Sequence, residues 1–113
     1  MSKFDDAVAK YTAESKKLKL GLSEDLISAV AKGLGPSIYK QDAETVSGTD
    51  VSELETVKRN FLIKKLGLKD SPELDKAIDE VMKKLGTSNR NKYRVHVYAL
   101  LAKKFNKTSV YGL

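Results

Sequence analysis

The sequence predicts an all-α fold: a compact single domain of five to six helices that spans residues 1–113. Apolar residues recur at spacings of three and four along most of the chain, which is the period of an amphipathic helix. Leucine–glycine pairs interrupt these segments, and such short turns join consecutive helices into antiparallel hairpins. Hydrophobic residues make up 41% of the chain and charged residues 32%, a composition typical of a folded domain.

The N-terminal third predicts two helices joined by a glycine turn. The first covers residues 3–18, and Ser2 is placed to cap its N-terminus. Gly21 lies between two leucines just beyond its end, where a glycine adopts the left-handed conformation at little cost. Ser23 is the expected cap of the second helix, which ends at the Gly-Leu-Gly-Pro sequence of residues 33–36.

The next segment, residues 37–50, has the least regular pattern. Ile38 and Tyr39 are apolar anchors that we expect in a short turn or a single helical turn. Residues 41–49 are mostly polar and contain a glycine, so we expect a loop with room for one short helix.

Two further helices follow this loop. One covers residues 51–66, with Asp50 as its cap and Glu53 completing a capping box. The other covers residues 72–85, where Ser71 is the expected cap and a proline occupies the first helical position. Its apolar residues fall within one narrow arc, as in a helix that packs on a core through one face.

The last predicted helix runs over residues 88–105 and is the central core helix of the domain. Residues 93–98 also alternate between polar and apolar, as a strand would. The helical spacing of the apolar residues that follow, and the absence of a partner strand, favour a helix. The tail, residues 106–113, carries apolar side chains, so we expect it to pack on the body or on a neighbouring subunit.

Four sequence blocks carry a resemblance to a known family. They are Gly-Pro-Ser-Ile-Tyr at 35–39, the segment 55–68, Arg-Asn-Lys-Tyr-Arg at 90–94, and Ser-Val-Tyr-Gly at 109–112. These blocks resemble a small bacterial family known as a domain of unknown function. The resemblance extends over nearly the whole chain and implies a compact all-helical domain. It implies no catalytic or binding residue, since the family has none that can be transferred.

Charge is distributed unevenly along the chain. Residues 1–57 contain 7 Lys and 10 Asp or Glu, a net charge of −3, whereas residues 58–113 contain 14 Lys or Arg and 5 Asp or Glu, a net charge of +9. The two parts sum to the +6 of the whole chain. Such asymmetry favours an anionic partner, although acidic helices that pack beside basic ones produce the same pattern.

Several kinds of chemistry lack support. The chain has no cysteine and one histidine, His96, so we expect no disulfide, no metal site and no cofactor. A serine nucleophile would need His96 as its base, but this residue falls on the polar side of the last helix, where we expect it in solvent. Residues 32–37 resemble a phosphate-binding loop only superficially, because the lysine precedes the glycines.

No segment predicts a membrane protein. Two aspartates lie near the N-terminus, where a signal peptide would need apolar residues, and no apolar run approaches the roughly 20 residues of a membrane helix. We therefore expect a cytoplasmic protein.

The start of the last predicted helix is the candidate site. A first helical turn normally carries acidic residues, because its free amides form a positive end. Here the turn carries Arg90, Lys92 and Arg94 next to Ser88, and cations together with free amides form an anion-binding site. The alternative is that Arg94, which lies within the apolar arc, reaches a carboxylate on another helix.

These observations favour one class of function and leave two others open. We expect a small non-enzymatic binding or interaction protein, with a homodimer as one form, that binds phosphate or carboxylate groups through residues 88–94. The first alternative is a nucleic-acid-associated protein that uses the basic half. An enzyme is the class with the least support.

Overall fold

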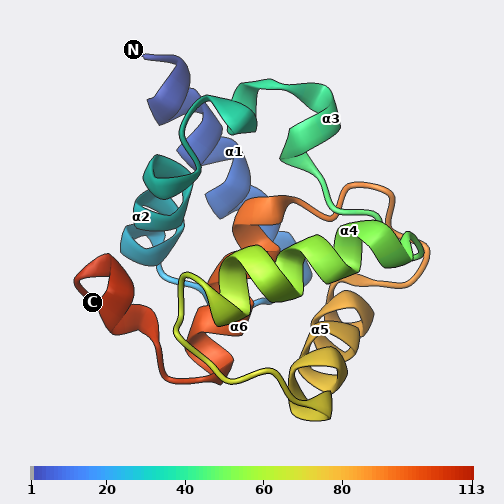
Figure 1. The fold of residues 1–113 in the computed structure, drawn as a ribbon. Coiled ribbons are helices and arrows are strands. Elements are labelled where there is room, and N and C mark those ends of the chain that lie inside the picture. Colours follow the sequence, from blue (N-terminus) through green and yellow to red (C-terminus); the bar gives the residue numbers. More distant parts are fainter. Residues whose placement is uncertain (1) are drawn as a thin grey trace.

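The computed structural model describes residues 2–113, apart from the side chain of Gln41. Six α-helices, one π-helical segment (η2) and two 3₁₀ segments (η1 and η3) follow one another, and no residue of the described part lies in a strand. This confirms the all-α prediction (Figure 1). The elements are α1 (Lys3–Leu18), α2 (Glu24–Leu34), η1 (Gly35–Tyr39), α3 (Gln41–Glu44), α4 (Val51–Thr56), η2 (Val57–Ile63), α5 (Pro72–Leu85), α6 (Arg94–Lys104) and η3 (Thr108–Tyr111).

The first two helices form an antiparallel pair with the expected caps (Figure 1). The hydroxyl oxygens of Ser2 and Ser23 each accept a hydrogen bond of 3.1 Å from the backbone N–H three residues further on. Gly21 has a φ of +70°, as the glycine turn predicted, but Lys19 also has a positive φ of 55° and is the first residue beyond α1. The turn buries Leu20, which is 2% exposed.

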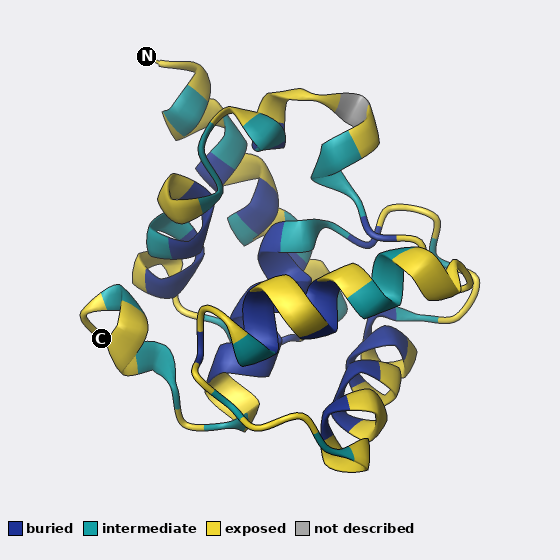
Figure 2. Cartoon of the chain, viewed as in Figure 1, coloured by how far each residue is buried: buried dark blue, intermediate teal, exposed yellow. Residues whose placement is uncertain are grey.

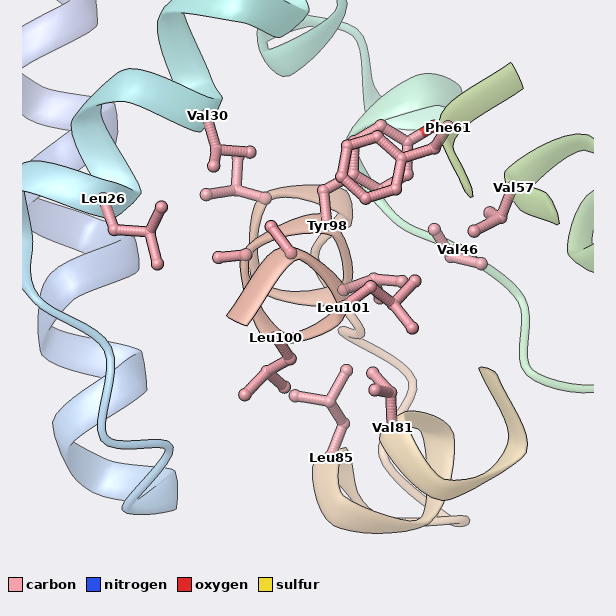
Figure 3. Packing of buried hydrophobic residues seen from close by; sticks show 14 of the residues in the cluster. Leu26, Val30, Val46, Val57, Phe61, Val81, Leu85, Tyr98, Leu100 and Leu101 are labelled. Carbon is pink, nitrogen blue, oxygen red and sulfur yellow. The ribbon is translucent and has the colours of Figure 1, made fainter. Parts of the chain in front are cut away.

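Helix α6 lies at the centre of the molecule. Eight consecutive residues, from Val95 to Ala102, are buried. Helices α1, α2, α3 and α5 and the segment η3 all contact α6. Figure 2 shows most of α6 in the dark blue of buried residues. Figure 3 shows side chains of α2, η2 and α5 arranged around this helix. A helix that is buried on every side has no solvated face.

The helix predicted over residues 51–66 changes character in its middle. It is α-helical only as far as Thr56 and continues as the π-helical segment η2, with hydrogen bonds from Lys64 N to Arg59 O and from Leu66 N to Phe61 O. The wider turn buries Phe61, whose ring stacks on Tyr98 of α6 with the centroids 4.0 Å apart. The prediction of one regular helix is therefore wrong in detail, because hydrogen bonds in its second half span five residues instead of four.

The caps of the two later helices differ from the predicted ones in part. Asp50 caps α4, since its Oδ1 accepts a hydrogen bond from Ser52 N at 3.0 Å. Glu53 forms no capping box and instead pairs with Arg94 of α6. Ser71 occupies the cap position of α5, but its hydroxyl makes no capping hydrogen bond.

The C-terminal tail packs on the body of the same chain. Segment η3 contacts α2 and α6, and Lys65 Nζ lies 5.4 Å from the centre of the Tyr111 ring. Val110 and Leu113 stay 38% and 54% exposed. In the described part of the chain, no helix combines the length and the apolar character needed to cross a membrane.

Candidate functional site

Helix α6 begins at Arg94, six residues later than predicted. The predicted helix N-terminus at residues 88–94 is therefore wrong. Tyr93 forms an isolated antiparallel bridge with Thr45, and Val46 N donates a hydrogen bond of 2.8 Å to Lys92 O. This pairing with a distant segment holds the backbone before α6 in an extended conformation.

Asn89 determines the path of the chain between α5 and α6. Its Nδ2 donates to Leu85 O at 2.9 Å, which satisfies a carbonyl at the end of α5. Its Oδ1 accepts from Asn91 N at 2.9 Å, which closes a turn stabilised by the asparagine side chain. The Asn-Arg-Asn sequence at 89–91 was the local signal for a turn in place of a helix.

The loop before α6 and the loop before α4 enclose a surface pocket with a volume of about 510 Å³. The two loops come together beside the N-terminal end of α4 (Figure 1). Three of the four predicted anion-binding residues, Ser88, Arg90 and Lys92, line this pocket. The full set of described lining residues is Asp42, Thr45, Val46, Ser47, Gly48, Thr49, Glu53, Thr87, Ser88, Asn89, Arg90 and Lys92.

Lys92 is the unusual residue of this pocket. It is only 5% exposed, and its Nζ donates a hydrogen bond to the carbonyl oxygen of Asn89. Within residues 2–113 no carboxylate forms an ion pair with it. Its stem packs on Gly48, where an added Cβ would lie 3.4 Å from Lys92 Cε. An ammonium group has three N–H donors, so two of them have no acceptor in the part of the chain that the structure describes.

Arg94 lies behind the pocket and makes internal contacts, as the alternative interpretation predicted. Its Nη2 lies 2.7 Å from Glu53 Oε1, and its Nε donates to Ala43 O at 2.8 Å. The Arg94 side chain is 14% exposed and that of Glu53 is 24% exposed. Arg94 therefore ties α3 and the first turn of α4, which carries the pocket residue Glu53, to α6.

The prediction that His96 is exposed to solvent is wrong. The residue is 0% exposed, because α6 is surrounded on all sides. The His96 Nε2 atom lies 2.8 Å from Tyr11 O, and since a carbonyl only accepts, Nε2 carries the proton. Burial lowers the pKa of His96 below its ordinary value, although the hydrogen bond to Tyr11 O and the charge of Glu14 oppose this shift.

A cluster that the sequence did not reveal joins α3 to α1. The Tyr11 hydroxyl donates to Glu44 Oε2 at 2.6 Å, and Lys10 Nζ lies 2.5 Å from the same oxygen. Lys10 Nζ also lies 5.0 Å from the ring centres of Tyr11 and Tyr93. Burial is the main cause that raises the pKa of Tyr11, and the hydrogen bond to Glu44 raises this pKa further. These contacts span residues far apart in the chain, so no local pattern could show them.

His96 takes no part in a nucleophile–base pair among the described residues. His96 Nδ1 is buried and has no hydrogen-bond partner among them, so no hydroxyl or carboxylate is paired with this ring nitrogen. Residues 2–113 also contain no group of three or more side chains placed to hold a metal ion. The pocket beside Lys92 is therefore the site with the clearest chemical character.

The family comparison agrees with the resemblance seen in the sequence blocks. A family model described as "protein of unknown function (DUF2853)" matches residues 10–109. No curated protein matches the chain. Because the match covers most of the 113 residues, the chain belongs to the DUF2853 family.

Proposed function

We propose that this protein is a non-enzymatic binding protein for small molecules that carry a phosphate or carboxylate group. The site is the pocket between the loops of residues 45–49 and 87–92. The observation that carries the proposal is Lys92, a residue only 5% exposed, whose ammonium group has one carbonyl acceptor and no carboxylate partner within residues 2–113.

An isolated buried cation is unfavourable, because losing its hydration costs several kcal/mol unless an anion or several acceptors replace the water. Lys92 lines a pocket that is open to solvent, so an anion bound in this pocket would lie beside the lysine. Arg90 adds a second cation on the same wall, and it is exposed and unpaired within the described chain. A phosphate or carboxylate group would satisfy both cations through charge-assisted hydrogen bonds.

A second cluster of cations gives only weak support for a nucleic-acid partner. Lys84, Lys103 and Lys104 line a second surface pocket. However, Lys104 pairs with Glu80, and Lys103 Nζ donates to a backbone carbonyl at 2.8 Å. Since two of the three cations already have partners inside the molecule, the pocket beside Lys92 is the stronger candidate for an anion.

We expect inorganic phosphate to raise the thermal unfolding temperature of the wild-type protein. At ten times the Kd, binding to the folded state alone adds about 1.4 kcal/mol, which is a shift of several degrees for a domain of this size. Lys92→Met should abolish the shift, because methionine keeps the apolar stem and removes the charge. Arg90→Ala should reduce it.

Lys64→Met is the matched control, since Lys64 is exposed and lies outside the pocket. This variant should keep the full phosphate response. Sulfate at the same ionic strength tests for competition at the site, and sodium chloride tests for general screening of the basic chain. An equal response to phosphate in wild type and Lys92→Met would refute the proposed site.

A further inference from the structure

The size of the pocket indicates a ligand larger than a single inorganic ion. Its volume of about 510 Å³ lies within the range of roughly 300–1,000 Å³ that is typical of sites for small organic molecules. Lys92 and Arg90 both belong to the loop before α6. A phosphate or carboxylate group beside them would therefore fill one part of the pocket and leave the rest to the remainder of the ligand.

Hydroxyl groups dominate the rest of the lining. They come from Thr45, Ser47 and Thr49 on one loop and from Thr87 and Ser88 on the other. Only one hydrogen bond joins two of these groups, between Ser47 Oγ and Thr49 Oγ1 at 3.4 Å. A hydroxyl group both donates and accepts, so this lining matches a ligand that itself carries several hydroxyl groups.

A carboxylate adds an acceptor to the lining. Asp42 lines the pocket, is exposed, and forms no ion pair within residues 2–113. The second lining carboxylate, Glu53, is already engaged by Arg94. A free carboxylate repels an anionic group but accepts hydrogen bonds from hydroxyl groups, so Asp42 suits the neutral, hydroxylated part of a ligand.

The lining also argues against two other classes of anion. None of its described residues is aromatic, whereas proteins commonly recognise nucleobases by stacking them on aromatic rings. Val46 is its one aliphatic residue, so a long apolar acid would gain little from burial there.

We infer that the pocket takes an anionic sugar or polyol, that is, a small polyhydroxylated molecule with one phosphate or carboxylate group. This inference rests on the proposed anion site. The acidic group lies against Lys92 and Arg90, and the hydroxyl groups lie against the threonine and serine side chains and Asp42.

Titration calorimetry on the full chain tests the inference with five probes: inorganic phosphate, glucose 6-phosphate, gluconate, glucose and phenyl phosphate. Glucose 6-phosphate or gluconate should bind at least about tenfold more tightly than inorganic phosphate and phenyl phosphate, a difference equivalent to two or three additional hydrogen bonds. The better of the two identifies the acidic group. Neutral glucose should bind more weakly than either, because it cannot pair with Lys92.

Two variants separate the two parts of the site. Asp42→Ala should weaken binding of the preferred sugar acid or sugar phosphate several-fold without weakening that of inorganic phosphate, which the carboxylate can only repel. Lys92→Met should weaken binding of both by about tenfold or more. Asp79→Ala is the matched control, because Asp79 is an exposed acid outside the pocket and should change neither.

The outcomes distinguish this inference from the proposed function. If inorganic phosphate binds through Lys92 but the sugar derivatives bind no more tightly, the inference fails and the anion site stands. Binding of phenyl phosphate as tight as that of the sugar derivatives has the same meaning, because phenyl phosphate has no hydroxyl groups on its ring. If none of the anions binds, or if Lys92→Met leaves their binding unchanged, the proposed function itself fails.

Discussion

Arg94→Met is expected to lower the free energy of unfolding by about 3 kcal/mol, the lower end of the range for breaking a buried ion pair. The substitution leaves the Glu53 carboxylate, 24% exposed, without its cation. It also removes the hydrogen bond to Ala43 O and the longer one, at 3.5 Å, to Thr45 O. Unfolding in urea, followed by circular dichroism at neutral pH, measures the change.

Arg59→Met provides the matched control. Arg59 and Glu55 form an ion pair of 2.6 Å in the same stretch of chain, but their side chains are 62% and 44% exposed. An exposed pair one helical turn apart contributes less than about 0.5 kcal/mol. If Arg94→Met is no more destabilising than Arg59→Met, the internal pair does not support the fold.

A double variant tests the cause of the loss. In Arg94→Met with Glu53→Gln, the partly buried carboxylate that lacks a cation is gone, so the stability should recover in part. The phosphate response should stay reduced in both variants, because residue 94 no longer holds Ala43 of α3 and Thr45 against α6. If the double variant recovers stability but not the phosphate response, Arg94 positions the pocket as well as stabilising the fold.

The positions of most helices could be predicted because their signals are local. Ser2, Ser23 and Asp50 each cap the helix that follows them, with hydrogen bonds to backbone N–H groups two or three residues away. A cap depends on a few neighbouring residues, so a single sequence contains the information.

The errors concern residues whose partners lie far away in the chain. The sequence predicts His96 in solvent, because an amphipathic helix usually exposes its polar stripe. In the structure, other helices bury α6 on all sides. The start of α6 was placed at Ser88, whereas pairing with residues 45–46 keeps the preceding chain extended. Tertiary contacts decide whether a polar stripe of a helix is buried and whether the chain before a helix is extended.

The candidate site was predicted in part for the same reason. The concentration of cations identified Ser88, Arg90 and Lys92, which the structure brings to one pocket. The opposite wall, residues 45–49, was predicted only as an irregular loop. The burial of Lys92 depends on that wall, because Gly48 packs on its side chain. No local pattern distinguishes this lysine from the exposed ones.

Acidification is expected to destabilise the protein below about pH 6.5, the ordinary pKa of histidine. Burial depresses the pKa of His96 in the folded state, so the unfolded chain binds the proton more readily. The stability is therefore fully present above the unfolded pKa and is lost as the pH falls from there toward the folded pKa. One proton taken up on unfolding gives a slope of up to about 1.4 kcal/mol per pH unit.

Urea unfolding at several values between pH 5 and pH 8 measures this slope, and His96→Gln assigns it. Glutamine can still donate a hydrogen bond to Tyr11 O but has no proton to gain, so the variant should show a flat profile over the same interval.

His96 is the only histidine in the chain. The Asp70 and Glu80 carboxyl groups have pKa values lowered by Lys58 and Lys104, and they titrate below the interval. A slope that persists in His96→Gln would therefore show that a group other than the buried imidazole governs the acid response. A flat wild-type profile would show that the core accommodates the imidazolium ion, with Nδ1, which has no partner among the described residues, as the site where the extra proton binds.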